Sequence, residues 1–272
     1  MIVNAPQTEK FYHRLVLDDE MSNTILITGA GRGIGLALTQ ALLNRGQRVI
    51  ATSRRPDPAG PLQQLLSQPG VEDRLSVHPL DITSDESVSS LARWVEQKHA
   101  ALDVLVNNGA IFIDRQNTSI ANLDLDHLVT TFQTNVVGVA RITKALLPFL
   151  ARSKRPRIVN ISSGAGLIAT KRNSKYYAYS ISKAAVNMFT RMLEMEAREQ
   201  SICVVAVTPG RVRTEMGDSD APLTPQECAE SLATMIEQIQ LSDTGRFLDR
   251  DGRPCFDGEF KDATGRVCSV GW

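Results

Sequence analysis

The sequence of 272 residues lacks the marks of a disulfide scaffold, a metal protein and a membrane protein. Its four cysteines (Cys203, Cys228, Cys255 and Cys268) form no C-x-x-C pair, and so few in a chain of this length do not make a disulfide framework. The histidines are scattered without metal-site spacing, so we expect no metal. No segment approaches the roughly 20 apolar residues that span a bilayer, so we expect no membrane partner.

An excess of charge of one sign is also missing. Thirty basic residues balance thirty acidic ones, whereas nucleic-acid-binding proteins usually carry a basic excess, so we expect no nucleic-acid partner. Hydrophobic residues make up 42% and charged residues 22%, which is typical of a folded globular protein. The first residues contain no apolar run long enough for a secretory signal, which favours a cytoplasmic location. We expect an N-terminal extension over 1–22 and a single domain over 23–272.

Short apolar runs alternate with longer helix-like segments along the chain. The runs rich in aliphatic residues predict strands at 24–28, 48–52, 75–80, 103–106, 157–161 and 202–207. The segments between them predict helices at 34–44, 84–99, 124–151, 177–200 and 225–240. Residues 54–61 and 152–156 are expected to be loops, and the tail from about Gly245 is rich in Gly, Asp and Arg. This alternation predicts βαβ units in a doubly wound, Rossmann-type α/β fold, with one parallel sheet and helices on both faces.

A glycine-rich turn, residues 28–35 (TGAGRGIG), separates the first expected strand from the first helix. Glycine permits close approach of the backbone to a ligand, and a helix N-terminus offers free N–H groups to a pyrophosphate. The spacing is G-x-x-x-G-x-G and differs from the usual G-x-G-x-x-G fingerprint. The alternative is a flexible turn without a ligand. Because the strand–turn–helix context is correct, we expect a dinucleotide to bind at Gly29, Arg32, Gly33, Ile34 and Gly35.

The end of the second expected strand indicates which dinucleotide binds. An acidic residue there holds the ribose 2′-hydroxyl of NAD, whereas an arginine accommodates the 2′-phosphate of NADP. Residues 52–55 read Thr-Ser-Arg-Arg, with no acid. Arg54, next to Ser53, can pair with the phosphate, and Arg32 offers a second cation. We therefore favour NADP(H); the alternative is that both arginines are solvated surface residues.

Two further strand ends carry candidate cofactor contacts, because ligands bind outside the carboxyl ends of strands in open α/β sheets. Asp81, followed by Ile82, either accepts a hydrogen bond from the adenine amino group or caps the helix that starts near residue 85. Asn108, Gly109 and Ala110 follow the fourth expected strand. Asn and Gly also simply make turns, which is the alternative for this segment.

A tyrosine and a lysine, Tyr179 and Lys183, lie four residues apart near the start of an expected helix and so share one face of it. The pKa of a phenol is ordinarily about 10, and a cation within about 4–6 Å lowers that pKa. A tyrosine tuned in this way can exchange a proton with a substrate oxygen near neutral pH. The alternative is a surface Tyr–Lys pair.

Other polar residues are expected near this pair. The strand at 157–161 leads into Ser162 and Ser163, either of which can hold a carbonyl oxygen at the carboxyl edge of the sheet. Asn135 lies inside an expected helix, where asparagine has no propensity advantage. A turn that can bind a carboxamide follows the sixth strand. It is formed by Pro209, Gly210, Val212 and Thr214.

Together these residues resemble the short-chain dehydrogenase/reductase family, in its single-domain branch. The markers, all in family order, are T-G-x-x-x-G-I-G from residue 28, N-N-G-A from 107, Asn135, I-S-S from 161, Y-x-x-x-K from 179 and P-G-x-V-x-T from 209. The distal segments 221–225 and 245–252 look like the C-factor and sniffer-type carbonyl reductases of that family.

The resemblance implies a catalytic tetrad of Asn135, Ser163, Tyr179 and Lys183. In that scheme Tyr179 is the proton donor for reduction, and Lys183 lowers its pKa and binds the nicotinamide ribose. Ser163, preferred to its neighbour on family alignment only, positions the carbonyl. Asn135 supports a proton relay through water, and Thr214 binds the carboxamide.

One departure from the family concerns the 16 residues that separate Ser163 from Tyr179, a longer interval than in many members. The extra residues lie in 170–175, a loop with three cations that would border the substrate site. This loop either shapes the pocket for an acidic or polar substrate or is a solvated insertion.

The sequence therefore predicts an NADPH-dependent oxidoreductase that transfers a hydride between nicotinamide and a small carbonyl or alcohol substrate. Two alternatives stay open: an NADP(H)-binding signalling or regulatory protein that acts through a partner, and a biosynthetic alcohol dehydrogenase or imine reductase. Because the family commonly pairs through the helices at 124–151 and 177–200, the resemblance implies a homodimer or homotetramer.

Overall fold

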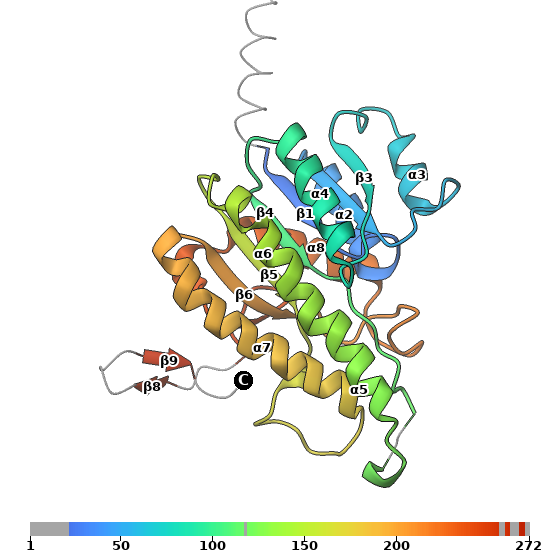
Figure 1. Cartoon of the computed structure of the whole chain (residues 1–272), viewed down its shortest axis with the longest axis vertical. Coiled ribbons are helices and arrows are strands. Elements are labelled where there is room, and N and C mark those ends of the chain that lie inside the picture. Colours follow the sequence, from blue (N-terminus) through green and yellow to red (C-terminus); the bar gives the residue numbers. More distant parts are fainter. Residues whose placement is uncertain (1–21, 117–118, 256–258, 262–266, 270–272) are drawn as a thin grey trace, which may run out of the picture.

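The computed structural model describes residues 22–116, 119–255, 259–261 and 267–269 (Figure 1). Within these ranges, seven strands form one parallel sheet in the order β3-β2-β1-β4-β5-β6-β7. The strands are Thr24–Ile27 (β1), Arg48–Ser53 (β2), Leu75–Pro79 (β3), Val104–Asn107 (β4), Arg157–Ile161 (β5), Cys203–Thr208 (β6) and Phe247–Asp249 (β7). The chain changes direction across the sheet between β1 and β4, so their carboxyl ends border a topological switch point.

Helices cover both faces of this sheet (Figure 1). Their bounds are Gly33–Asn44 (α2), Pro61–Leu66 (α3), Asp85–Lys98 (α4), Leu125–Phe132 (α5), Gly138–Leu150 (α6), Tyr177–Ala197 (α7) and Pro225–Gln238 (α8). Buried side chains of α2, α3 and α8 pack on one face, and those of α4, α6 and α7 pack on the other. The predicted doubly wound, Rossmann-type α/β fold is confirmed.

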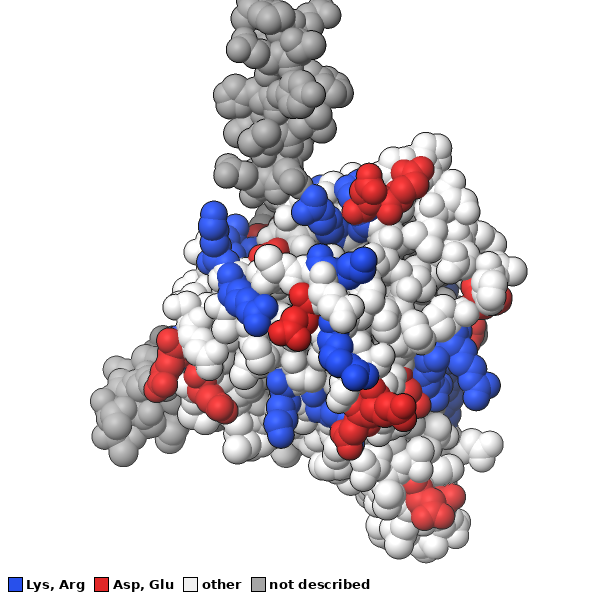
Figure 2. All heavy atoms as spheres, turned by 45° about the horizontal axis from the view of Figure 1, so that its top comes forward, with Lys and Arg blue, Asp and Glu red and all other residues white. Residues whose placement is uncertain are grey.

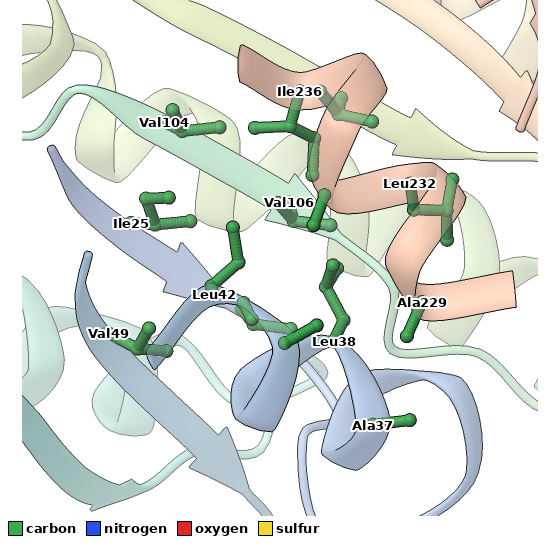
Figure 3. Close-up of a cluster of buried hydrophobic side chains, with 14 of the residues drawn as sticks. Ile25, Ala37, Leu38, Leu42, Val49, Val104, Val106, Ala229, Leu232 and Ile236 are labelled. Atoms are coloured by element: carbon green, nitrogen blue, oxygen red, sulfur yellow. The ribbon is translucent and has the colours of Figure 1, made fainter. Parts of the chain in front are cut away.

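The core follows from the alternation of side chains along each strand. Ile25 and Ile27 of β1 point to the face covered by α2 and α8, whereas Leu26 between them points to the opposite face. On α2, Leu38 and Leu42 lie one turn apart and meet these strands, as Figure 3 shows. Strands buried on both faces read as continuous apolar runs, which is why the sequence predicts them so clearly.

Two short elements of the structure were not predicted from the sequence. Helix α3 begins at Pro61, the last residue of the loop predicted over 54–61, because proline suits the first position of a helix. The tail from Gly245 contains β7, which pairs with β6 and adds the last strand of the sheet. Phe247 and Leu248 are both buried, so this strand completes the core beside β6.

The helix predicted as continuous over 124–151 is interrupted. It consists of α5, a π-helical turn at Gln133–Val137, and α6. Asn135 lies in the π-turn, where its Nδ2 donates to the Ile111 carbonyl at 2.9 Å and its Oδ1 accepts from the Ile111 N–H at 2.8 Å. The wider turn thus ties the helix to the loop after β4. Turns of this kind frequently mark functional sites.

The remaining features concern the surface and the ends of the chain. The predicted N-terminal extension lies outside the described residues, apart from Ser22. A short antiparallel pair joins Glu259–Lys261 (β8) to Val267–Ser269 (β9). In the ranges that the structure describes, no helix has both the length and the apolar character to cross a membrane, and no three His, Cys, Asp or Glu side chains gather as a metal site. Basic and acidic side chains are interspersed on the face drawn in Figure 2.

Candidate active site

The glycine turn joins the end of β1 to the start of α2, and its shape demands glycine. Gly29 has a φ of +68° and Gly33 a φ of +55°, which other residues rarely adopt. A Cβ placed on Gly35 would lie 2.4 Å from the Gly29 carbonyl oxygen, and one on Gly29 would lie 2.8 Å from the Gly109 Cα. The glycines therefore let the turn, the helix and the segment after β4 pack against one another.

The segment after β4 braces this turn directly. Asn108 Nδ2 donates to the carbonyl oxygens of Thr28 and Gly29 at 2.9 and 3.0 Å. In return, Thr28 Oγ1 accepts from the N–H groups of Asn108 and Gly109 at 3.0 and 2.9 Å. Asn108 and Gly109 are thus more than a simple turn, because they hold the first two residues of the glycine turn in place. Ala110 follows them and is partly exposed.

The first turn of α2 fits a dinucleotide pyrophosphate. Arg32, at the N-cap, contributes no side-chain cap, and the first turn contains no acidic residue. The N–H groups of Gly33, Ile34 and Gly35 open this helix at the carboxyl edge of the sheet, where such groups suit phosphate oxygens. A helix start without an acid or a side-chain cap, preceded by closely packed glycines, is the arrangement that an anionic ligand needs.

Of the two arginines predicted to recognise a phosphate, Arg32 lies within this turn and Arg54 follows the end of β2 beside it. Ser53 ends β2, and its Cβ would lie 3.2 Å from a Cβ placed on Gly31; Arg54 and Arg55 follow it and are exposed. Arg32 is also exposed and pairs with the Glu215 carboxylate. The exposed Arg54 guanidinium therefore lies at the edge where the adenosine end of a dinucleotide would lie, whereas Arg32 would have to exchange its Glu215 partner for a phosphate.

Asp81 does not cap α4, so that alternative is wrong. The N-cap is Ser84, whose Oγ accepts from the Ser87 N–H at 3.2 Å. Asp81 Oδ1 accepts instead from the N–H and the hydroxyl of Thr83, at 2.9 and 2.7 Å. These bonds lower the pKa of Asp81, and the Arg54 cation acts in the same direction. Asp81 and Arg54 are therefore electrostatic neighbours at adjacent strand ends.

Ile82 has a mainly structural environment. Its side chain is buried, and a Cβ on Gly138 would lie 2.8 Å from it. Its carbonyl oxygen accepts from Arg141 Nη1 at 2.9 Å. Ile82 therefore packs the strand end against α6 while its neighbour Asp81 stays partly exposed.

The loop after β6 lies against the glycine turn. A Cβ placed on Gly33 would lie 3.4 Å from Thr214 Cγ2, and Thr214 Oγ1 accepts from the Gly217 N–H at 2.9 Å. Val212 is buried and forms a parallel bridge with Leu223, which anchors the loop. Pro209 is buried at the start of this loop, and Gly210 has a φ of +79°. Of the P-G-x-V-x-T residues, the structure thus brings Thr214 against the glycine turn.

The Tyr179 phenol meets a serine hydroxyl at the end of β5. Tyr179 hydrogen-bonds with Ser163, whose Oγ also accepts from the Ala165 N–H at 3.1 Å. Ser162 Oγ, by contrast, is buried and donates to Asn187 Oδ1 at 2.5 Å. Of the two serines, Ser163 is therefore the one whose hydroxyl reaches the phenol.

Lys183 lies below the Tyr179 ring, with Nζ 5.7 Å from the ring centroid. It is only 4% exposed, and its Nζ donates to the Ile161 carbonyl oxygen at 2.7 Å. Burial lowers the pKa of Lys183 to about 8. Burial also raises the pKa of Tyr179, against the opposing effect of the Ser163 hydrogen bond. The expectation of a lowered Tyr179 pKa is wrong for this structure, because desolvation of the phenol dominates.

Asn135 connects the π-turn to the helix that carries the tyrosine. Besides its bonds to Ile111, its Nδ2 donates to Ser182 Oγ at 3.0 Å, and Ser182 Oγ donates to the Tyr179 carbonyl at 2.7 Å. Both N–H donors of the Asn135 amide are thereby engaged. The side chain braces α7 and the loop after β4, and its part in a proton relay stays a prediction.

Two residues of the loop after β4 contact Tyr179 although no sequence motif indicated them. The Phe112 ring stacks on the Tyr179 ring, with centroids 4.5 Å apart, and meets Tyr176 edge-on at 4.9 Å. The buried carboxylate of Asp114 accepts from the N–H of Ala178 at 2.8 Å. Their only sequence signal is their position just after N-N-G-A.

Five of the six residues in the cationic loop at 170–175 are exposed, as expected of a solvated insertion. Lys171 Nζ donates to the Lys175 carbonyl at 3.0 Å and to Ser180 Oγ at 2.9 Å. Arg172 Nη1 donates to the carbonyls of Ala169 and Lys171 at 2.9 and 3.1 Å. Two of the three cations therefore hold the loop together and fasten it to α7. That structural use argues against recognition of an acidic substrate by these two groups.

The chain belongs to the short-chain dehydrogenase family, whose sequence model matches residues 23–222. It is 34% identical over 221 residues to the short-chain dehydrogenase anuI of Penicillium roqueforti, a match that covers 76% of this chain and 86% of that protein. Among solved structures, the carbonyl reductase Sniffer of D. melanogaster superposes with a TM-score of 0.80 at 31% identity, over 86% of this chain and 98% of that one. The NADPH-bound carbonyl reductase from chicken fatty liver gives a TM-score of 0.77 with the same identity and coverage.

Proposed function

We propose that the chain is an NADPH-dependent oxidoreductase that reduces a small carbonyl compound, with Tyr179 as the proton donor. The observation that carries this proposal is the contact of the Tyr179 phenol with the Ser163 hydroxyl, above the buried ammonium of Lys183. Similarity to two carbonyl reductases, one of them solved with NADPH, supports the same activity.

Each residue of the site has a distinct role in the reaction. When bound, the reduced nicotinamide supplies the hydride. The Ser163 hydroxyl donates to the carbonyl oxygen and holds it next to the phenol. Tyr179 then gives its proton to that oxygen as negative charge develops there, so the carbonyl becomes an alcohol. Because its pKa is raised, Tyr179 is protonated at neutral pH, which is the form that reduction requires.

Lys183 stabilises the phenolate that this transfer leaves behind. With a pKa of about 8 it is mostly charged at neutral pH, and a nearby cation favours the ionised phenol. The same ammonium, together with Tyr179, would hold the nicotinamide ribose, and Thr214 would hold the carboxamide. Asn135 fixes the position of α7 relative to the loop after β4.

The cofactor site favours NADPH over NADH. The segment after β2 offers Ser53 and Arg54 and contains no acid to hold a free 2′-hydroxyl. The remaining contacts would come from the glycine turn and from strand ends, through Gly29, Arg32, Gly33, Ile34, Gly35, Asp81, Ile82, Asn108, Gly109, Ala110, Pro209, Gly210 and Val212.

The proposal includes a homodimer or homotetramer, located in the cytoplasm, that pairs through α5 and α7. These helices lie side by side in Figure 1. Each exposes large apolar side chains at helical spacing: Leu125, Val129 and Phe132 on α5, and Ile181, Met188, Met192 and Met195 on α7. A second copy of the chain would cover such a stripe.

The activity is tested by following NADPH and NADH consumption against a panel of aldehydes, ketones, quinones and imines. We expect consumption that favours NADPH and is abolished in Tyr179→Phe. Equal turnover in wild type and Tyr179→Phe would contradict the mechanism. Tight NADPH binding without turnover on any member of the panel would contradict the reductase activity.

A further inference from the structure

Helix α7, which carries Tyr179, has an unusual beginning. Its N-cap residue is Tyr176, with φ +60° and ψ +58°, a left-handed conformation that non-glycine residues rarely adopt. Tyr176 supplies no side-chain cap, and the first turn contains no acidic residue. The first N–H groups of a helix have no partner within the helix, so those of α7 need acceptors from elsewhere in the fold.

A buried carboxylate from a distant loop supplies the acceptors. Asp114, 64 residues before Ala178, accepts from the Ala178 N–H through Oδ2 at 2.8 Å. Its Oδ1 accepts from the N–H of Tyr179 itself at 3.3 Å. The side chain is only 4% exposed. Both carboxylate oxygens are therefore used on consecutive amides of the turn that carries the phenol.

Other helices of the molecule are capped locally. Ser84, Asp124 and Thr224 each immediately precede the helix that they cap, and each accepts from an N–H of its first turn. A local cap fixes a helix end relative to its own preceding residue. The Asp114 cap instead fixes the first turn of α7 relative to the loop after β4.

That loop touches the tyrosine in a second way and is itself held in place. The Phe112 ring stacks on the Tyr179 ring, and the Arg115 guanidinium lies 5.5 Å from the Phe112 centroid. Asn135 binds both backbone groups of Ile111. Within residues 111–115, Phe112 and Asp114 thus contact Tyr179, and Ile111 binds the Asn135 amide.

We propose that Asp114 is a positioning residue for the proton transfer. Its carboxylate locks the first turn of α7 to the loop after β4 and so holds the Tyr179 phenol against Ser163. This inference rests on the proposed function. A misplacement of about 1 Å at a reacting group can cost on the order of 100-fold in rate, so loss of this lock acts on kcat. Most of the proposed cofactor contacts lie elsewhere, on the glycine turn, the ends of β2 and β3 and the loop after β6, so NADPH affinity should change much less than kcat.

The test compares Asp114→Ala, Asp114→Asn and the control Asp124→Ala, which deletes a cap of the same residue type on α5. We expect Asp114→Ala to lower kcat by roughly 10- to 100-fold, with a much smaller change in the Kd of NADPH. Asp114→Asn keeps an acceptor oxygen at the helix end and should recover most of that loss. Asp124→Ala should lower Tm but leave kcat unchanged.

Three outcomes would overturn the proposal. One is an Asp114→Ala variant that keeps wild-type kcat at a temperature where it is folded. Another is a Kd for NADPH that rises as much as kcat falls. The third is an Asp114→Asn variant, which retains the shape of the side chain, that is no more active than Asp114→Ala.

Hydrogen exchange separates failure of this inference from failure of the proposed function. If the wild type has no Tyr179-dependent turnover, the proposed function fails, and the amides of Ala178 and Tyr179 still decide the structural claim. Their protection should fall in Asp114→Ala and persist in Asp124→Ala. Unchanged protection in Asp114→Ala would overturn the lock.

Discussion

The cofactor side and the catalytic side of the sheet edge are built on different principles. On the cofactor side, Gly29 and Gly33 adopt positive φ values, and Asn108 bonds their turn through backbone carbonyls. On the catalytic side, Tyr179 is held through side chains, by the ring of Phe112 and the carboxylate of Asp114. Both sides join distant segments of the chain, but the first does so through glycines that allow close packing of the backbone, and the second through side chains of the loop after β4.

This difference explains what a sequence can reveal about each side. A backbone with positive φ or a close approach accepts few residue types, so it appears as a motif of glycines and asparagines. A side-chain support such as that of Phe112 and Asp114 places no such restriction on the backbone, so it leaves no motif of this kind. If the contrast is correct, variants on the two sides should fail in different ways.

The largest effect is expected on the catalytic side, from Tyr179→Phe. Loss of the proton donor should lower kcat/KM by about 10²- to 10⁴-fold, while the Kd of NADPH changes little because Lys183 and the glycine turn remain. Steady-state kinetics and NADPH titration measure the two quantities. Tyr177→Phe, two residues earlier, is the matched control and should retain activity. A loss of NADPH affinity in Tyr179→Phe as large as the loss in kcat/KM would contradict the division between a cofactor side and a catalytic side.

On the cofactor side, Arg54→Ala should act on affinity. Hydrogen bonds to charged groups contribute about 1.5–3 kcal/mol, so the Kd of NADPH should rise by roughly 10- to 100-fold. The Kd of NADH, which has no 2′-phosphate, should not change. Arg55→Ala removes an adjacent exposed arginine and serves as the control. An equal loss of NADH affinity would show that Arg54 does not recognise the phosphate.

The dependence of the unfolding free energy on pH tests whether Lys183 is buried with a lowered pKa. Burial lowers its pKa from 10.5 to about 8, so between these values the unfolded chain binds more protons than the folded chain. The contribution of Lys183 to stability therefore rises with pH in this window. The unfolding free energy of the wild type, relative to Lys183→Met, should increase by about 2 kcal/mol from about pH 7 to about pH 9.5. Denaturant unfolding without cofactor measures it, and a constant difference would contradict the buried ammonium.

The smallest effect is expected from Gly29→Ala, which strains the glycine turn. A left-handed conformation costs a non-glycine residue roughly 1–2 kcal/mol, and the new Cβ would lie 2.8 Å from the Gly109 Cα. Stability and NADPH affinity should both fall. Gly164→Ala is the control, since a Cβ there meets nothing within 4 Å. A Gly29→Ala variant that binds NADPH normally would remove the argument for a backbone-shaped site.

Much of the fold could be predicted from the sequence because its strands are buried on both faces. The run over 24–28 and its counterparts are apolar throughout, and helices of ordinary length separate them. Helix α3 and strand β7 were missed because each is short and lies in a segment rich in Pro, Gly or charged residues. The π-turn at Asn135 was missed because it depends on a contact with Ile111.

The same distinction applies to the site: residues in local motifs could be predicted, and residues that act through long-range contacts could not. The spacing of Tyr179 and Lys183 identified the pair, and the order of motifs singled out Ser163. The roles of Asp114 and Phe112 could not be predicted, because each acts across more than 60 residues of intervening chain. The direction of the Tyr179 pKa shift also depends on burial, which is a property of the folded protein and not of local spacing.

The most direct test measures NADPH affinity and single-turnover hydride transfer together, at saturating NADPH, for Tyr179→Phe and Arg54→Ala. Tyr179→Phe should bind NADPH nearly as tightly as the wild type and transfer hydride slowly. Arg54→Ala should bind NADPH weakly and, once saturated, transfer hydride at the wild-type rate. If each variant lost affinity and transfer rate to the same extent, the separation of a cofactor side from a catalytic side, and with it the role assigned to Tyr179, would be contradicted.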